Sequence, residues 1–168
     1  STTGMYFKGG ARDVVVQRNR VENTGDAGIL VGFDTSVEFF DLSANPQYYE
    51  SIRGIVRNNV VRNTGYSGIG MYASKDAIVA NNTIINAGWR RDGEKGGCIY
   101  VEKNALANVF NNLIVNCKFR AMTPSFNIPN DPEEGYNDKS VIDYNYYASG
   151  TQKSDVVFAD ESGVASSW

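Results

Sequence analysis

The chain has 168 residues, the size of one ordinary domain, and its 42% hydrophobic and 21% charged residues are typical of a folded globular protein. It contains no histidine, which excludes a Ser-His-Asp triad, a Cys-His pair and a His-ligated zinc site. A net charge of −3 without a basic stripe argues against nucleic-acid binding, and no apolar run approaches the roughly 20 residues of a membrane span.

Short strands separated by asparagines and turn residues follow one another along the chain. Residues 4–9 (GMYFKG) predict a first strand. Five later segments align with one another, each with an alternating apolar run, an asparagine and a second alternating run: 14–25, 54–65, 77–88, 106–117 and 140–149. The runs GILVGF, GIGMYAS and GCIYVE predict a third strand after three of them. The repeat is roughly 23 residues long and contains no helical segment.

The aligned segments place asparagines in two columns. The first column is Asn19, Asn59, Asn82, Asn112 and Asn145, and the second is Asn23, Asn63, Asn86 and Asn116. Asparagine tolerates the left-handed backbone of a sharp bend, and stacked amide side chains can hydrogen-bond to one another. We therefore expect a bend at every column position and ladders of asparagines along the repeat axis.

Three short strands per repeat without a helix exclude a βαβ unit or a helical solenoid. They predict coils with three faces, in which each strand pairs in parallel with its equivalent about 4.8 Å away in the next coil. Up to about Tyr147 the sequence resembles the right-handed parallel β-helix of the pectate lyase-like superfamily. The resemblance implies an all-β solenoid of about five coils. A β-sandwich is the alternative, although it does not need asparagines in register.

We expect residues 1–168 to form a single β-helix domain that is a fragment of a longer β-helix, since no amphipathic helix caps the first coil. Three irregular insertions, at about 33–53, 89–96 and 123–140, border the third strand. Insertions in a solenoid fall at its turns and often mark the binding face. The third-strand face is therefore the expected functional surface.

Outward positions on that face combine tyrosines, small residues and charges. Aromatic rings surrounded by carboxylates and amides suit a carbohydrate groove, so the expected ligand is a polysaccharide or oligosaccharide. We expect the tyrosines to be exposed. The expected substrate-binding residues are Tyr72, Tyr100, Asp34, Arg120 and Lys103.

The segment RRDGEKGGCIYVEKN (90–104) carries the densest chemistry. It places Asp92 and Glu94 in a turn and Glu102 on the strand that leaves it. Glycosidases need two carboxyls, about 5–5.5 Å apart for retention or about 6.5–9.5 Å for inversion. A loop folded back over its strand would bring Asp92 or Glu94 near Glu102, and these three are the expected catalytic residues.

The stretch GGCIYVEKN resembles the Gly-Gly-x-Ile-Tyr-x-acid turn and strand of β-helical glycoside hydrolases of the β-xylosidase-like and lacto-N-biosidase-like groups. The resemblance puts Glu102 at an acidic active-site position, with glutamate where aspartate is more usual. It implies a hydrolase that needs no cofactor or metal, located outside the cytoplasm as a secreted or periplasmic protein of bacterial type.

Other functions stay open at this point. A polysaccharide lyase acting on a uronate polymer needs a base, which Lys95, Lys103, Lys118 or Arg120 could supply, and Ca²⁺ held by the three acidic residues named above. A non-catalytic carbohydrate-binding module and a purely structural solenoid are further alternatives. Self-association through the open ends of the coil stack is also expected.

The two cysteines are not expected to form a disulfide framework or a metal cluster. Cys117 stands where other repeats have threonine or alanine, which predicts a small turn or core residue. Cys98 is expected to begin a strand without a functional partner.

Overall fold

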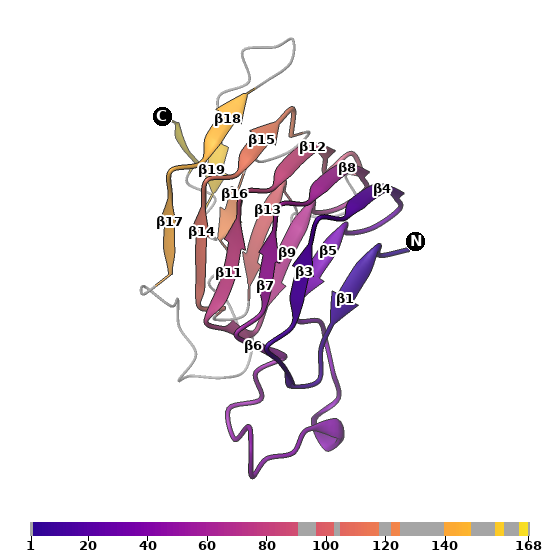
Figure 1. The fold of residues 1–168 in the computed structure, drawn as a ribbon, viewed down its shortest axis with the longest axis vertical. Coiled ribbons are helices and arrows are strands. Elements are labelled where there is room, and N and C mark those ends of the chain that lie inside the picture. Colours follow the sequence, from indigo (N-terminus) through magenta and orange to yellow (C-terminus); the bar gives the residue numbers. More distant parts are fainter. Residues whose placement is uncertain are drawn as a thin grey trace.

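The computed structural model describes residues 2–90, 97–102, 105–117, 122–124, 140–148, 157–159 and 165–167. It confirms the all-β solenoid, because strands at equivalent positions of successive coils lie side by side and pair in parallel (Figure 1). Among the described residues the exceptions to this pattern are the antiparallel pair β19–β20 and one 3-10 turn, η1 (Val37–Phe39).

The strands form four sheets. Sheet A contains β1 (Met5–Phe7), β5 (Ile29–Val31), β9 (Ile69–Tyr72), β13 (Ile99–Glu102), β16 (Met122–Pro124), β19 (Val157–Ala159) and β20 (Ala165–Ser167). Sheet B contains β2 (Ala11–Arg12), β6 (Ser51–Ile52) and β10 (Ser74–Lys75). Sheet C contains β3 (Val15–Gln17), β7 (Ile55–Arg57), β11 (Ala77–Ala80), β14 (Ala107–Phe110) and β17 (Val141–Asp143). Sheet D contains β4 (Arg20–Thr24), β8 (Val60–Thr64), β12 (Thr83–Ala87), β15 (Leu113–Val115) and β18 (Tyr146–Ala148).

The expectation of three strands per coil is therefore incomplete. Sheets A, C and D are the three expected faces, and sheet B adds a two-residue strand at the corner between A and C in the first three coils. The short strand arises because the chain has to turn between two faces, and its backbone can pair with the corner above and below it.

The core is a narrow column of stacked apolar side chains. In sheet A, Ile29, Ile69 and Ile99 lie in register and are fully buried. Val31 and Met71 form the next inward row, also fully buried. The alternation of inward and outward residues expected for the third strand is confirmed, and it determines which side chains reach the outer face.

The first asparagine column is a buried ladder. The side-chain Nδ2 of Asn59 donates to Oδ1 of Asn82, and Nδ2 of Asn82 donates to Oδ1 of Asn112, each at 3.0 Å. Nδ2 of Asn82 also donates to the carbonyl of Val56 in the preceding coil at 2.9 Å. Every polar atom of a buried amide needs such a partner, so this ladder is part of the core.

The expectation that each asparagine adopts the left-handed backbone of a bend is correct for one of the two columns only. In the second column the asparagines themselves are left-handed, with φ between 53° and 57°. In the first column the left-handed residue is the one before each ladder asparagine, namely Arg18, Asn58, Asn81, Asn111 and Tyr144. The ladder asparagine has to direct its amide inward, so the preceding residue makes the bend.

The expectation that the cysteines form no disulfide is wrong, because Cys98 and Cys117 are joined, with their Cα atoms 5.6 Å apart. Cys117 nevertheless packs against the core, as expected. The two positions are neighbours in every coil. A Cβ placed on Gly68, one coil before Cys98, would lie 3.5 Å from the Cβ of Ala87, one coil before Cys117. The disulfide replaces this glycine–alanine contact and joins the turn before β13 to the turn after β15.

The insertion between β5 and β6 projects from the coil stack as a loop that carries η1 (purple, Figure 1). The insertion at 89–96 joins β12 to β13, and the one at 123–140 follows β16; both lie mostly outside the described residues. All three adjoin sheet A, as expected, but they border both ends of its strands.

Candidate functional site

A cavity of about 240 Å³ lies on the outer face of sheet A. Its walls come from β5, β9 and β13 and from the turns before β5 and β9. The lining residues are Asp26, Ala27, Leu30, Phe33, Tyr66, Gly70, Met71, Tyr72, Tyr100 and Glu102.

Strand register brings the cavity floor together. Leu30, Gly70 and Tyr100 are direct partners across β5, β9 and β13, and Tyr72 pairs with Glu102 one step further along. Gly70 lies in the middle of this row and lines the cavity. A Cβ there would lie 2.7 Å from Leu30 Cδ2, so the glycine allows the Leu30 side chain to pack over it.

Tyr66 forms one wall of the cavity. It lies in the turn after β8, and its ring meets that of Tyr100 edge-on, with the ring centroids 6.0 Å apart. Tyr100 is only 4% exposed. The expectation that Tyr100 is an exposed tyrosine is wrong, because the turn side chain packs over it. Tyr72 is half-buried at the edge of the hollow.

The cavity is electrostatically negative. Burial raises the pKa of Tyr66 to about 12, and the charges of Glu102 and Asp26 act in the same direction. Burial also raises the pKa of Tyr72 to about 12, with further contributions from the carboxylates of Asp34, Glu102 and Glu50. Both phenols are therefore neutral hydroxyls near pH 7.

A buried carboxylate fixes the insertion beside the cavity. Glu50 accepts hydrogen bonds from Thr35 N and Thr35 Oγ1, at 2.7 Å each, and from Gly9 N at 2.9 Å. It thus joins both ends of the 33–50 loop to the first coil. The sequence analysis did not single out Glu50, because its structural role depends on a contact with Gly9, which lies 41 positions away in the sequence.

The structure brings three of the expected site residues together: Glu102, Tyr72 and Tyr100 all line the cavity. Asp34 is exposed and lies close enough to Tyr72 to affect its pKa. Its carbonyl accepts a hydrogen bond from Lys8 Nζ at 2.8 Å. The expected residues Asp92, Glu94, Lys103 and Arg120, and the candidate bases Lys95 and Lys118, lie outside the described residues.

Sequence reasoning missed Asp26 and Tyr66, although a signal was present. They occupy the same place in the repeated patterns NTGDAG (23–28) and NTGYSG (63–68). Equivalent turn positions stack in a solenoid, and Tyr66 N donates to Asp26 O at 3.3 Å. Aligning these turns would have placed both side chains beside the outward face of sheet A.

The described part of the chain contains no cluster of three or more His, Cys, Asp or Glu residues that could hold a metal ion. None of its helices is long and apolar enough to cross a membrane.

Comparison with known families supports the geometry. Residues 1–128 match the family model described as right handed beta helix region. The chain belongs to the right-handed β-helix family. The matched part of this β-helix includes every residue that lines the cavity. No curated protein and no solved structure matches the chain.

Proposed function

We propose that this β-helix binds an uncharged glycan on the outer face of sheet A and hydrolyses it, with Glu102 as a catalytic carboxylate. The observation that carries the proposal is the cavity itself. It combines tyrosine rings, phenolic hydroxyls and the carboxylates of Asp26 and Glu102 around a floor that includes Gly70.

Sugar rings match this lining. Their C–H faces pack on aromatic rings, while their hydroxyls need donors and acceptors such as the phenols of Tyr66 and Tyr72. The volume of about 240 Å³ is below the roughly 300 Å³ of pockets for drug-sized ligands, so we assign it to one sugar residue. Aromatic surface for a neighbouring residue of the glycan is offered by Phe33 and Tyr6. Tyr6 is 56% exposed and pairs with Leu30 across β1 and β5.

The charge of the cavity favours an uncharged substrate over a uronate. The carboxylates that disfavour ionisation of Tyr66 and Tyr72 would also repel a bound carboxylate. A lyase needs the opposite, a positive group beside the substrate carboxylate. Lys8 Nζ lies 5.5 Å from the ring centroid of Phe33 at one side of the cavity, but both charged residues in the described lining, Asp26 and Glu102, are carboxylates, and this favours hydrolysis over elimination.

The proposed chemistry uses two carboxyl groups. One donates a proton to the leaving glycosidic oxygen, and the other acts as nucleophile or activates water. Glu102, 6% exposed, supplies one of them. Asp26 is the second carboxyl among the described lining residues, and Asp92 and Glu94 are further candidates from the adjoining insertion.

We place the protein outside the cytoplasm, as a secreted or periplasmic protein. The disulfide between Cys98 and Cys117 supports this assignment, because such bonds form and persist in oxidising compartments. The proposed hydrolysis requires no cofactor.

The test is an assay on neutral and uronate polysaccharides that follows both reducing ends and the ultraviolet absorbance of unsaturated products, with and without Ca²⁺. We expect reducing ends from a neutral substrate only, and a loss of at least about 100-fold in Glu102→Gln. The matched control, Asp143→Asn, changes an exposed carboxylate of sheet C and should be fully active.

Unsaturated products from a uronate polymer would overturn the hydrolase in favour of a lyase. Saturable binding without any product would overturn catalysis and leave a binding module. Neither binding nor turnover across the panel would refute a glycan ligand altogether.

A further inference from the structure

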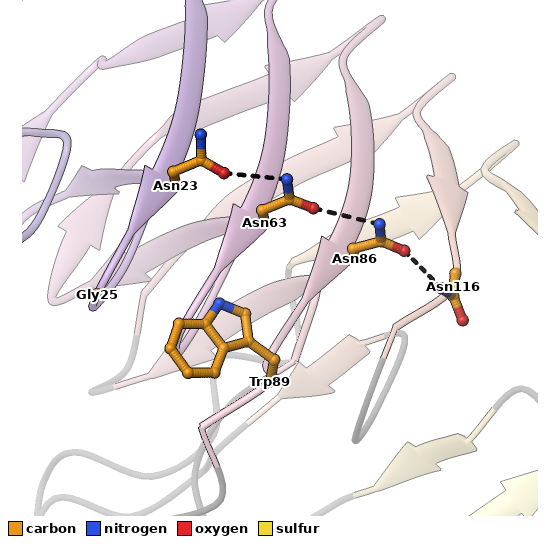
Figure 2. A pocket seen from close by; sticks show the side chains of 6 residues that line it. All are labelled: Asn23, Gly25, Asn63, Asn86, Trp89 and Asn116. Carbon is orange, nitrogen blue, oxygen red and sulfur yellow. Dashed lines mark hydrogen bonds between the residues drawn. The ribbon is translucent and has the colours of Figure 1, made fainter.

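A second hollow, of about 530 Å³, lies where the chain leaves sheet D. It is lined by Asn23, Gly25, Asn63, Asn86, Trp89 and Asn116 (Figure 2). We propose that this groove, here called the amide groove, is a separate binding platform for an extended, uncharged polysaccharide. The sugar would stack on Trp89 and hydrogen-bond to the row of asparagine amides.

The amides form an ordered row on the surface. Nδ2 of Asn63 donates to Oδ1 of Asn23 at 3.0 Å, and Nδ2 of Asn86 donates to Oδ1 of Asn63 at 3.2 Å. Asn116 donates to Asn86 in the same way, as the dashed lines in Figure 2 show. Each bond uses one N–H and one lone pair, and a primary amide has a second of each. The row can therefore offer donors and acceptors at the spacing of strands, about 4.8 Å.

These asparagines differ from those of the buried ladder. Their own backbone is left-handed, and Asn23 and Asn116 are exposed to solvent while Asn63 and Asn86 are half-buried. Glycine would serve the bend at least as well as asparagine. The bend alone does not require asparagine at all four positions. The amides also hydrogen-bond to one another from coil to coil, and these bonds hold them in the row that the ligand would contact.

Trp89 is exposed yet held in place. Its side chain is 50% exposed, so the face of the indole ring is open to a ligand. The backbone N–H groups of Gly88 and Arg90 donate to Thr64 O at 2.9 Å and Gly65 O at 2.7 Å. Nη1 of Arg90 donates to Gly25 O at 3.1 Å. The backbone at Trp89 is thus held beside the amides before any ligand arrives, which lowers the cost of ordering the site.

The chemistry of the groove selects among ligands. The six described lining residues are uncharged, and the guanidinium of Arg90 at the edge of the groove already donates to Gly25 O, so the amides and the indole dominate the surface offered to a ligand. The amide row crosses β4, β8 and β12, so it presents side chains and no free strand edge to a peptide. A polysaccharide supplies flat C–H faces for the indole and repeating hydroxyl groups for the amides.

The groove adjoins the cavity without sharing residues with it. Gly25 lines the groove and the next residue, Asp26, lines the cavity. A chain held in the groove would therefore stay close to the cavity, which raises the effective concentration of substrate there. This consequence rests on the proposed hydrolysis, but binding in the groove does not.

Tryptophan fluorescence tests the groove directly. The sequence contains two tryptophans, so Trp168→Phe leaves Trp89 as the sole emitter. In this background we expect a saturable change of emission with neutral oligosaccharides. Asn63→Gly, which keeps the left-handed backbone but removes an amide, should weaken binding at least about tenfold. Asn58→Gly changes an exposed left-handed asparagine at another bend and should leave binding unchanged.

Two outcomes would overturn the amide groove: no emission change across the neutral panel, or equal affinity in Asn63→Gly and its control. Glu102→Gln separates this proposal from the hydrolase. It should abolish product formation and preserve the Trp89 response. Loss of that response in Glu102→Gln would assign the signal to the cavity and refute the groove, whereas turnover without any Trp89 response would refute the groove alone.

Discussion

Asn59 donates both its backbone N–H and its side-chain Nδ2 to Oδ1 of Asn82 in the next coil, each at 3.0 Å. The same pattern joins Asn82 to Asn112. One buried oxygen thus satisfies two buried donors at each step of the solenoid, and the coils are connected through their cores as well as through their sheets.

Asn82→Ala should be strongly destabilising. It removes the acceptor of two Asn59 donors and the donor to Val56 O, all in the buried interior. Unsatisfied buried groups cost roughly 1–3 kcal/mol each, so we expect a loss of about 3 kcal/mol or more, measured by urea denaturation. Asn81→Gly, at the exposed neighbouring bend, should stay within about 0.5 kcal/mol. Equal losses in the two variants would contradict the structural role of the buried ladder.

Removing the disulfide should also lower stability. Cys98 and Cys117 close a loop across a sequence separation of 19, for which loop-closure entropy predicts roughly 3 kcal/mol. We expect the double substitution to alanine and chemical reduction of the wild type to produce the same shift in guanidinium denaturation. A reductant that destabilised the double variant as well would show that the shift has another origin.

Glu50→Ala should release the loop between β5 and β6 while the coil stack stays folded. The variant leaves the N–H groups of Gly9 and Thr35 without their carboxylate acceptor. Hydrogen exchange of these two amides should become at least about tenfold faster, while that of Ile69 in the core is unchanged. Glu38→Ala, at an exposed position of the same loop, is the control. Unchanged exchange at Gly9 and Thr35 would contradict the anchoring role of Glu50.

Alkaline pH should destabilise the fold through its buried tyrosines. The folded pKa values of Tyr66 and Tyr72 are about 12, against an unperturbed value of about 10. Because the folded state binds these protons more tightly, stability is fully present below pH 10 and falls as the pH rises from about 10 through 12. In a pH titration, the absorbance of phenolate should therefore rise in additional steps between about pH 10 and 12. The variants Tyr66→Phe and Tyr72→Phe should each remove one of these steps. Phenolate formation in a single step near pH 10 would refute this account.

The repeat in the sequence predicted the fold because its signals are periodic. Alternating apolar residues and the asparagine columns define the inward positions, and these determine the outward row of Leu30, Gly70 and Tyr100. The presence of Tyr72, Tyr100 and Glu102 on one face could therefore be predicted from alternation alone.

The walls of the cavity could not be predicted in this way. Tyr66 covers Tyr100 because a turn side chain folds back over the sheet, and strand alternation says nothing about turns. Glu50 lies at the end of an insertion that matches no repeat. The disulfide was missed because Cys98 and Cys117 were considered one at a time, although both stand 30 residues after stacked partners, Gly68 and Ala87.

The central claim is that an uncharged sugar occupies the cavity on sheet A. The measurement that tests it most directly is calorimetry of a neutral oligosaccharide binding to the Gly70→Ala variant, which gives the Kd to compare with that of the wild type. The added Cβ would lie 2.7 Å from Leu30 Cδ2 and would force this side chain of the cavity lining to move, so we predict binding at least about tenfold weaker than in the wild type. Tyr146→Ala, at an exposed tyrosine of sheet D, should bind as the wild type does. Equal affinity in Gly70→Ala and the wild type would show that the sugar does not bind in the cavity.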